Sequence, residues 1–172
     1  MKDLSPPGEV RHTTREHFER LVHTYSDMVY RVAYHALKNR ADAEDVLQTV
    51  LLRLFEHSAE FESDEHAKAW LIRVTVNESR KLLRTPWRKR ILPLEEWRDE
   101  PVFDRPERSE LFQAVMALPR NYRIVVYLFY YEELTTAEIA AAMGAKPSTV
   151  RTWLMRAREK LKLTLTPELQ EV

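Results

Sequence analysis

Only two glycines occur among the 172 residues, and this scarcity is the strongest constraint on what the chain can fold into. Chains rich in β-structure need glycine and other turn-forming residues at the many reversals between strands. This chain is instead rich in Leu, Ala, Arg and Glu, which all favour helices. Apolar residues recur three and four positions apart over long stretches, as they do on one face of a helix. The sequence therefore predicts an all-α fold.

Breaks in this periodicity divide the chain into four parts. Residues 1–13 hold paired prolines and no periodic apolar residues, so we expect a flexible N-terminal tail. Residues 93–106 are acidic and contain three prolines, which indicates a flexible linker. We expect residues 14–92 and residues 107–166 to form two small helical domains on either side of it. The expected helices cover about residues 14–37, 42–56, 65–84, 107–117 and 119–131, followed by a final pair.

The final pair of helices is separated by a tight turn. Thr135 and Glu138 have the spacing of a capping box, in which each side chain satisfies a free backbone donor at a helix start. Gly144 is the residue most tolerant of a left-handed helix end. Because Pro147 cannot continue a helix, we expect Ser148 to cap the next one. A short helix, a glycine turn and a longer helix are the layout of a helix-turn-helix.

The longer helix of this pair has two distinct sides. Its apolar stripe repeats at intervals of four, three and four and consists of Val150, Leu154, Ala157 and Leu161. The opposite side carries Arg151, Thr152, Met155, Arg156 and Glu159. A polar, basic first half is typical of a helix that reads the major groove of DNA. The alternative is an ordinary helical hairpin with a solvated basic face.

The helix expected over residues 42–56 also has two sides. Its core stripe consists of Val46, Leu47, Val50, Leu51 and Leu54. The other side carries Asp45, Gln48, Thr49, Leu52 and Glu56. Leu52 therefore lies among polar residues, which is either an ordinary exposed leucine or part of a docking surface.

A basic stripe on the helix over residues 65–84 is the third feature. It consists of Arg73, Asn77, Arg80 and Arg84, with Trp70 beside it. Arginines neutralise phosphates and an aromatic ring stacks on an unpaired base, so this combination fits single-stranded nucleic acid. Trp70 could equally be a core residue beside a solvated face.

Composition excludes several other functions. The chain has no cysteine, which removes disulfides, thiolate metal sites and a cysteine nucleophile. The six histidines are scattered without the i, i+4 spacing of metal ligands, so we expect them to be solvated and expect no metal or cofactor. A net charge of zero argues against indiscriminate coating of nucleic acid and favours selective contacts together with a protein partner. With no apolar run long enough to cross a bilayer, we expect a cytoplasmic protein.

Three motifs together resemble a known family. They are residues 42–50 (Asp-Ala-Glu-Asp-Val-Leu-Gln-Thr-Val), residues 69–77 (Ala-Trp-Leu-Ile-Arg-Val-Thr-Val-Asn) and the helix-turn-helix through Leu161. In this order they resemble the two domains of extracytoplasmic-function (ECF) sigma factors, the smallest members of the sigma-70 superfamily. The resemblance covers about residues 18–163 and implies a region 2-like domain followed by a region 4-like domain, with no enzymatic activity and no small-molecule substrate.

The resemblance also implies a role for each surface. The helix around Asp45 would dock on the β′ clamp helices of core RNA polymerase, and the second domain would meet the β flap. The implied polymerase-binding residues are Asp45, Gln48, Thr49, Leu52 and Glu56. The implied −10 contacts are Phe61, Ser63, Trp70, Arg73, Asn77, Arg80, Lys81 and Arg84. The implied −35 contacts are Ser148, Thr149, Arg151, Thr152, Met155, Arg156 and Arg158. Family members are commonly held inactive by an anti-sigma factor.

Three positions depart from the family pattern. Lys81 stands where many members have an aspartate, Ser148 stands where a glycine is usual, and Trp153 stands where an arginine is frequent. Two rival functions remain at this point. A stand-alone helix-turn-helix regulator would leave the first domain unexplained. A nucleic-acid enzyme built on Glu44 and Asp45 is disfavoured because adjacent residues diverge by about 100° on a helix.

Overall fold

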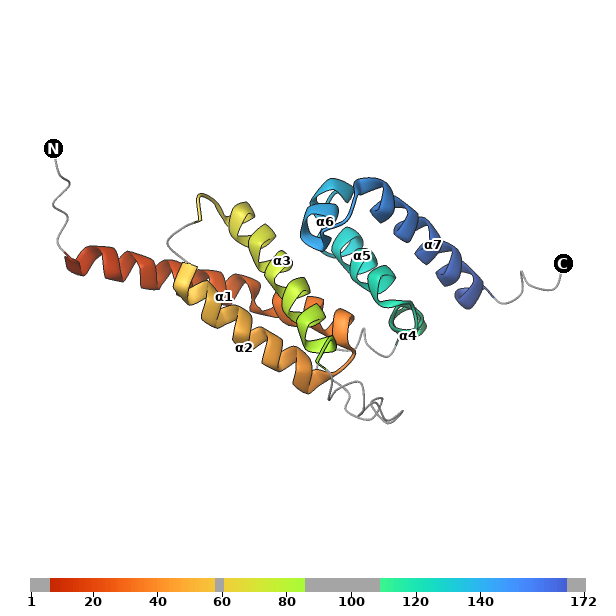
Figure 1. Cartoon of the computed structure of the whole chain (residues 1–172), viewed down its shortest axis with the longest axis horizontal. Helices are drawn as coiled ribbons and strands as arrows, with labels where there is room; N and C mark the ends of the chain where they lie inside the picture. Colours follow the sequence, from red (N-terminus) through yellow and green to blue (C-terminus); the bar gives the residue numbers. More distant parts are fainter. Residues whose placement is uncertain (1–6, 58–60, 86–108, 167–172) are drawn as a thin grey trace.

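A computed structural model describes residues 7–57, 61–85 and 109–166, with only the backbone described for residues 7–14. These residues form seven α-helices and no strand, which confirms the all-α prediction (Figure 1). The helices are α1 (Pro7–Leu37), α2 (Arg40–His57), α3 (Asp64–Leu83), α4 (Glu110–Met116), α5 (Arg120–Tyr130), α6 (Thr136–Met143) and α7 (Pro147–Leu165). The expected linker, residues 93–106, lies outside the described residues. No helix in the described ranges combines the length and apolar character needed to cross a membrane.

Helices α1, α2 and α3 pack on one another as the first bundle. The predicted stripe of α2 faces its core, where Val46, Val50 and Leu54 are buried. Two side chains cap the helix starts. The backbone N–H of Asp42 donates to Asn39 Oδ1 (2.9 Å), and the N–H of His66 donates to Ser63 Oγ (3.1 Å). Polar residues between the helices thus fix where α2 and α3 begin.

Helices α4 to α7 form the second bundle. Six consecutive residues of α5, from Arg123 to Leu128, are buried, and α4, α6 and α7 pack around this helix. On α7 the predicted apolar stripe faces this core, with Val150, Leu154 and Ala157 buried and Leu161 half-buried.

Two helices begin at a proline that was expected to lie before the helix. Helix α1 begins at Pro7 rather than at residue 14, and α7 begins at Pro147 with Lys146 as its N-cap residue, so the expectation that Ser148 caps this helix is wrong. The physical reason is the same in both cases. Proline cannot extend a helix from within, but its fixed φ and missing N–H suit the first helical position, where no intrahelical donor is required.

The two bundles lie against each other. Helix α5 packs on α1 and α6 packs on α3, so one continuous set of buried side chains runs through both bundles (Figure 1). His35, near the C-terminal end of α1, is buried in this interface, which corrects the expectation that all histidines are solvated. Its ring stacks on Tyr127 of α5 at 4.5 Å between centroids.

Candidate nucleic-acid interface

The geometry of the α6–α7 turn sets the direction of α7. Thr135 Oγ1 accepts from the N–H of Glu138 (3.2 Å), and Glu138 Oε2 accepts from the N–H of Thr135 (2.7 Å), which completes the predicted capping box. These hydrogen bonds lower the pKa of Glu138. Gly144 ends α6 in the left-handed region with φ of 62°, as predicted. Helix α7 then leaves the turn with one side of its first half exposed.

The exposed side of α7 brings most of the predicted −35 residues together. Ser148, Arg151, Met155 and Arg156 are exposed, and Thr149 and Thr152 are half-buried. The Thr152 hydroxyl donates to the carbonyl of Ser148 (3.0 Å). A strip of two guanidinium groups, hydroxyls and one thioether on the first turns of a helix offers both phosphate contacts and base-edge contacts.

Arg158 and Trp153 lie apart from this strip. Arg158 Nε donates to the Tyr130 hydroxyl (2.7 Å), and its guanidinium lies 5.5 Å from the centroid of the Phe129 ring. The structure therefore holds Arg158 against α5. Trp153 is half-buried and packs on the core, so it extends the apolar side of α7.

Most of the predicted basic stripe of α3 is exposed, but one member is not. Arg73, Asn77, Lys81 and Arg84 are exposed. Arg80 instead reaches the second bundle, where its Nη1 donates to the carbonyl of Met143 at the end of α6 (2.8 Å). Burial, and then the charges of Arg84 and Arg120, lower the pKa of Arg80.

An aromatic cluster lies at the start of α3. The half-buried Trp70 ring lies 5.3 Å from Phe61 and 5.7 Å from His57, and Phe61 in turn lies 5.5 Å from His66. Ser63, another predicted −10 residue, uses its side-chain oxygen to cap α3. The cluster places a stackable surface beside the basic stripe.

The outer face of α2 presents acids, an amide and two large apolar groups. Asp45, Gln48 and Glu56 are exposed there, and Thr49 is half-buried. The side chain of Leu52 is 69% exposed, and that of Phe55 is 65% exposed. Sequence reasoning missed Phe55, although its position three residues after Leu52 puts both on one face. The Phe55 and Phe18 rings pack edge to face, with 5.3 Å between their centroids.

Comparison with known proteins matches both bundles to family models. Residues 21–89 match the family described as sigma-70 region 2, and residues 108–161 match sigma-70, region 4. The RNA polymerase sigma-E factor of Streptomyces coelicolor is 35% identical over 153 residues, which cover 84% of each chain. The ECF RNA polymerase sigma factor SigE of Mycolicibacterium smegmatis is 30% identical, and the match spans 84% of this chain but only 60% of that protein.

Solved structures share the fold. The sigma factor RpoE of Bartonella quintana, solved in complex with the anti-sigma factor NepR, superposes with a TM-score of 0.68 at 20% identity, covering 87% of this chain and 96% of that one. The two family models fall on the two bundles in the order that sigma factors require, and the Streptomyces relative matches across both. The chain therefore belongs to the ECF group of the sigma-70 family and is an RNA polymerase sigma factor for transcription initiation, without enzymatic activity of its own.

Proposed function

We propose that three separate faces of this sigma factor carry its three tasks. The α2 face binds core RNA polymerase, the exposed side of α7 reads the −35 element, and α3 with the Phe61–Trp70 cluster holds the opened −10 element. The observation that carries the proposal is the α2 face, where Leu52 and Phe55 are about two-thirds exposed among polar side chains. Apolar anchors inside a polar rim are the usual composition of a protein-docking surface.

On the polymerase side, the proposed contacts are Asp45, Gln48, Thr49, Leu52 and Glu56, with Phe55 added from the structure. Their partner would be the β′ clamp helices, and the second bundle would meet the β flap. Since bacterial transcription takes place in the cytoplasm, we infer that the protein works there.

On the promoter side, the proposed −35 strip is Ser148, Thr149, Arg151, Thr152, Met155 and Arg156. Arg158 would join it only after leaving Tyr130. The proposed −10 contacts are Phe61, Ser63, Trp70, Arg73, Asn77, Lys81 and Arg84, together with Arg80 once it is released from Met143. Opening the duplex costs a few kcal/mol per unstacked step, and stacking of bases on the aromatic cluster would offset part of it.

We also propose an anti-sigma partner. The structurally similar sigma factor RpoE was solved with the anti-sigma factor NepR, and the similar chain CnrH was solved with the cytosolic domain of CnrY. An anti-sigma factor that covered the α2 face would block polymerase directly.

The test compares core binding with promoter opening. Leu52→Asp should weaken competition for core polymerase at least tenfold, because it places a charge at the centre of the apolar pair. Ala69→Asp adds the same charge to an exposed position on α3, outside the α2 face, and should leave core binding unchanged. Arg73→Ala with Asn77→Ala should impair promoter opening and spare core binding. Equal core binding by Leu52→Asp and the unmodified protein would refute the assignment of the α2 face.

A further inference from the structure

The interface between the two bundles is held at one end by arginines that reach across to α1. Arg123 of α5 is only 7% exposed, and its Nε donates to the carbonyl of His35 (2.7 Å) while its Nη2 donates to that of Ala36 (3.4 Å). Arg120 Nε donates to the same Ala36 carbonyl (3.2 Å). These carbonyls lie in the last turn of α1, where a cation is favoured by the helix dipole and by the unpaired acceptors.

The other end is held by α3. Lys68 Nζ lies 3.0 Å from Glu132 Oε2 and 3.3 Å from the Glu132 carbonyl, in the loop between α5 and α6. The two side chains are 27% and 16% exposed, so solvent screens this pair less than a surface pair. Tyr127 donates its hydroxyl to the second carboxylate oxygen of Glu132 (2.9 Å), which fixes the carboxylate toward Lys68. Arg80, on the Met143 carbonyl, adds a third crossing point.

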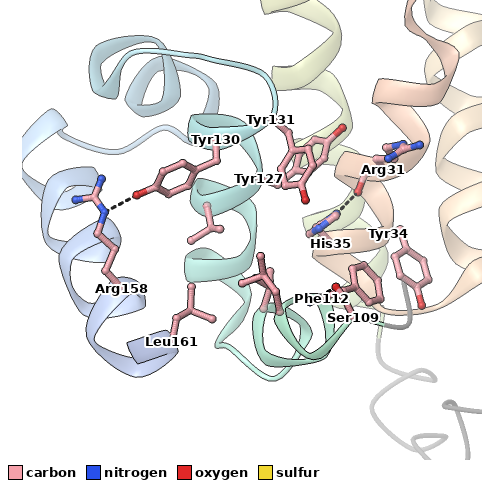
Figure 2. Close-up of a pocket in the computed structure, with 13 residues that line it drawn as sticks. Arg31, Tyr34, His35, Ser109, Phe112, Tyr127, Tyr130, Tyr131, Arg158 and Leu161 are labelled. Atoms are coloured by element: carbon pink, nitrogen blue, oxygen red, sulfur yellow. Dashed lines mark hydrogen bonds between the residues drawn. The ribbon is translucent and has the colours of Figure 1, made fainter. Parts of the chain in front are cut away.

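Apolar packing between the bundles is incomplete. A cavity of about 410 Å³ lies between α1 and the helices α4, α5 and α7 (Figure 2). Figure 2 shows His35 of α1 beside Tyr127 of α5 at one side of the cavity, and Arg158 of α7, hydrogen-bonded to Tyr130, at the other side. Because this cavity reduces the apolar contact between the bundles, the hydrogen bonds and the ion pair at either end contribute a large share of the attraction that holds the bundles together.

This closed arrangement cannot reach both promoter elements. The −35 and −10 elements are roughly 25 base pairs apart, or about 85 Å along B-DNA. In the closed arrangement α6 packs on α3 and α7 packs on α6, so the axes of α3 and α7 lie about two helix-packing distances apart, or about 20 Å. If extended, the connection over residues 86–108 could span up to roughly 80 Å. The two bundles must therefore separate before α3 and α7 can engage one promoter.

We propose that the Lys68–Glu132 pair, Arg80 on the Met143 carbonyl, and Arg123 on the His35 and Ala36 carbonyls form an intramolecular latch. The latch holds this sigma factor in a closed state that cannot engage a promoter. It also occupies Arg80, one of the proposed −10 contacts, so the inference rests on the proposed function for its consequence. Closing lowers the apparent affinity for a promoter in proportion to the fraction of molecules that are open.

Charge reversal at the Lys68–Glu132 pair tests the latch in the free, full-length protein. Because the chain has no cysteine, His23→Cys and Lys160→Cys place one dye on α1 and one on α7 at exposed positions. In this labelled protein Glu132→Lys should lengthen the mean distance between the dyes. Adding Lys68→Glu should restore the pair with its signs exchanged and return the distance to that of the parent. Glu133→Lys makes the same charge change at the exposed neighbour and should leave the distance unchanged.

Run-off transcription with core polymerase supplies the functional readout. Opening by Glu132→Lys should lower the protein concentration needed for half-maximal initiation by about three- to tenfold, and the double exchange should reverse this gain. Lys68→Met removes the pair without reversing a charge and should act in the same direction, provided that the helix content matches the parent.

Two outcomes would overturn the latch: an unchanged dye distance in both Glu132→Lys and Lys68→Met, or a longer distance with no gain in initiation. If no variant, nor the parent, starts transcription with core polymerase, the proposed function fails, while the dye distances in the free protein still decide whether the latch exists.

Discussion

At the scale of single residues, Arg123 and His35 are buried polar side chains at the interface between the bundles. Arg123 donates to carbonyls of both bundles, because its Nη1 bonds the Leu118 carbonyl (2.6 Å) while Nε bonds that of His35. Burial lowers the pKa of Arg123 to about 10, so it remains charged at neutral pH. Arginine suits this position because its rigid fork serves several acceptors at once, which a lysine cannot do.

His35 makes the stability of the closed protein dependent on pH. Burial, and the nearby charges of Arg123 and Arg31, lower the pKa of His35 to about 4, whereas an unfolded histidine titrates near 6.5. Between these values the unfolded chain binds more protons, so the contribution is complete above pH 6.5 and falls as the pH drops toward 4. We expect a loss of up to ~3 kcal/mol across this window, seen as a falling unfolding temperature.

Two variants separate His35 from other acid effects. His35→Phe keeps an aromatic ring against Tyr127 and should flatten the pH dependence between 6.5 and 4. His66→Gln, which replaces an exposed histidine, should show the same dependence of unfolding temperature on pH as the parent. The same slope in His35→Phe and the parent would mean that other groups cause the acid sensitivity.

At the scale of elements, Gly144 controls how α6 turns into α7. Its φ of 62° is a left-handed conformation that costs other residues about 1 kcal/mol, while an added Cβ would meet nothing within 4 Å. Gly144→Ala should therefore lower the free energy of unfolding by about 1 kcal/mol through the backbone alone, measured by urea denaturation. Ala141→Gly, at an exposed position within α6, provides a comparison in which glycine itself is the destabilising residue. A neutral or stabilising effect of Gly144→Ala would contradict the assigned backbone strain.

Sequence patterns predicted the elements well because their causes are local. The capping box of Thr135 and Glu138 and the apolar stripe of α7 involve residues three or four positions apart, where spacing alone determines the contact. The start of α7 at Pro147 was predicted incorrectly, since a proline stops one helix and begins another equally well.

Contacts between the bundles left no comparable signal. Arg123 and His35 are 88 positions apart, and nothing in the spacing of either residue indicates the other. Arg80 illustrates the same point: its place on a periodic basic stripe indicated solvent, yet α3 packs against α6 on that side as well as within its own bundle. A helix with two packed sides cannot be recognised from one amphipathic pattern.

At the scale of the whole molecule, the closed arrangement leaves the −35 face exposed but occupies part of the −10 face. Helix α7 lies on the side of its bundle away from α3, and its −35 strip is already exposed (Figure 1). Arg80 of the −10 face is meanwhile held by the carbonyl of Met143. The free protein should therefore bind a −35 duplex more tightly than a −10 single strand. Even the duplex should bind weakly, because few cationic side chains contact its phosphates.

Opening the latch should change only one of these two affinities. Glu132→Lys frees Arg80 and should strengthen binding of a single-stranded −10 oligonucleotide by the free protein several-fold, while affinity for a −35 duplex stays the same. Arg151→Ala with Arg156→Ala should instead weaken binding of the −35 duplex and leave binding of the single strand unchanged. The reason is that both guanidinium groups belong to α7, away from the −10 face. Fluorescence anisotropy at one fixed salt concentration measures the affinity of the parent and of each variant for both oligonucleotides. If Glu132→Lys strengthened the binding of both oligonucleotides equally, the cause would be its added positive charge rather than the release of Arg80. The conclusion that closing occupies the −10 face but not the −35 face would then be wrong.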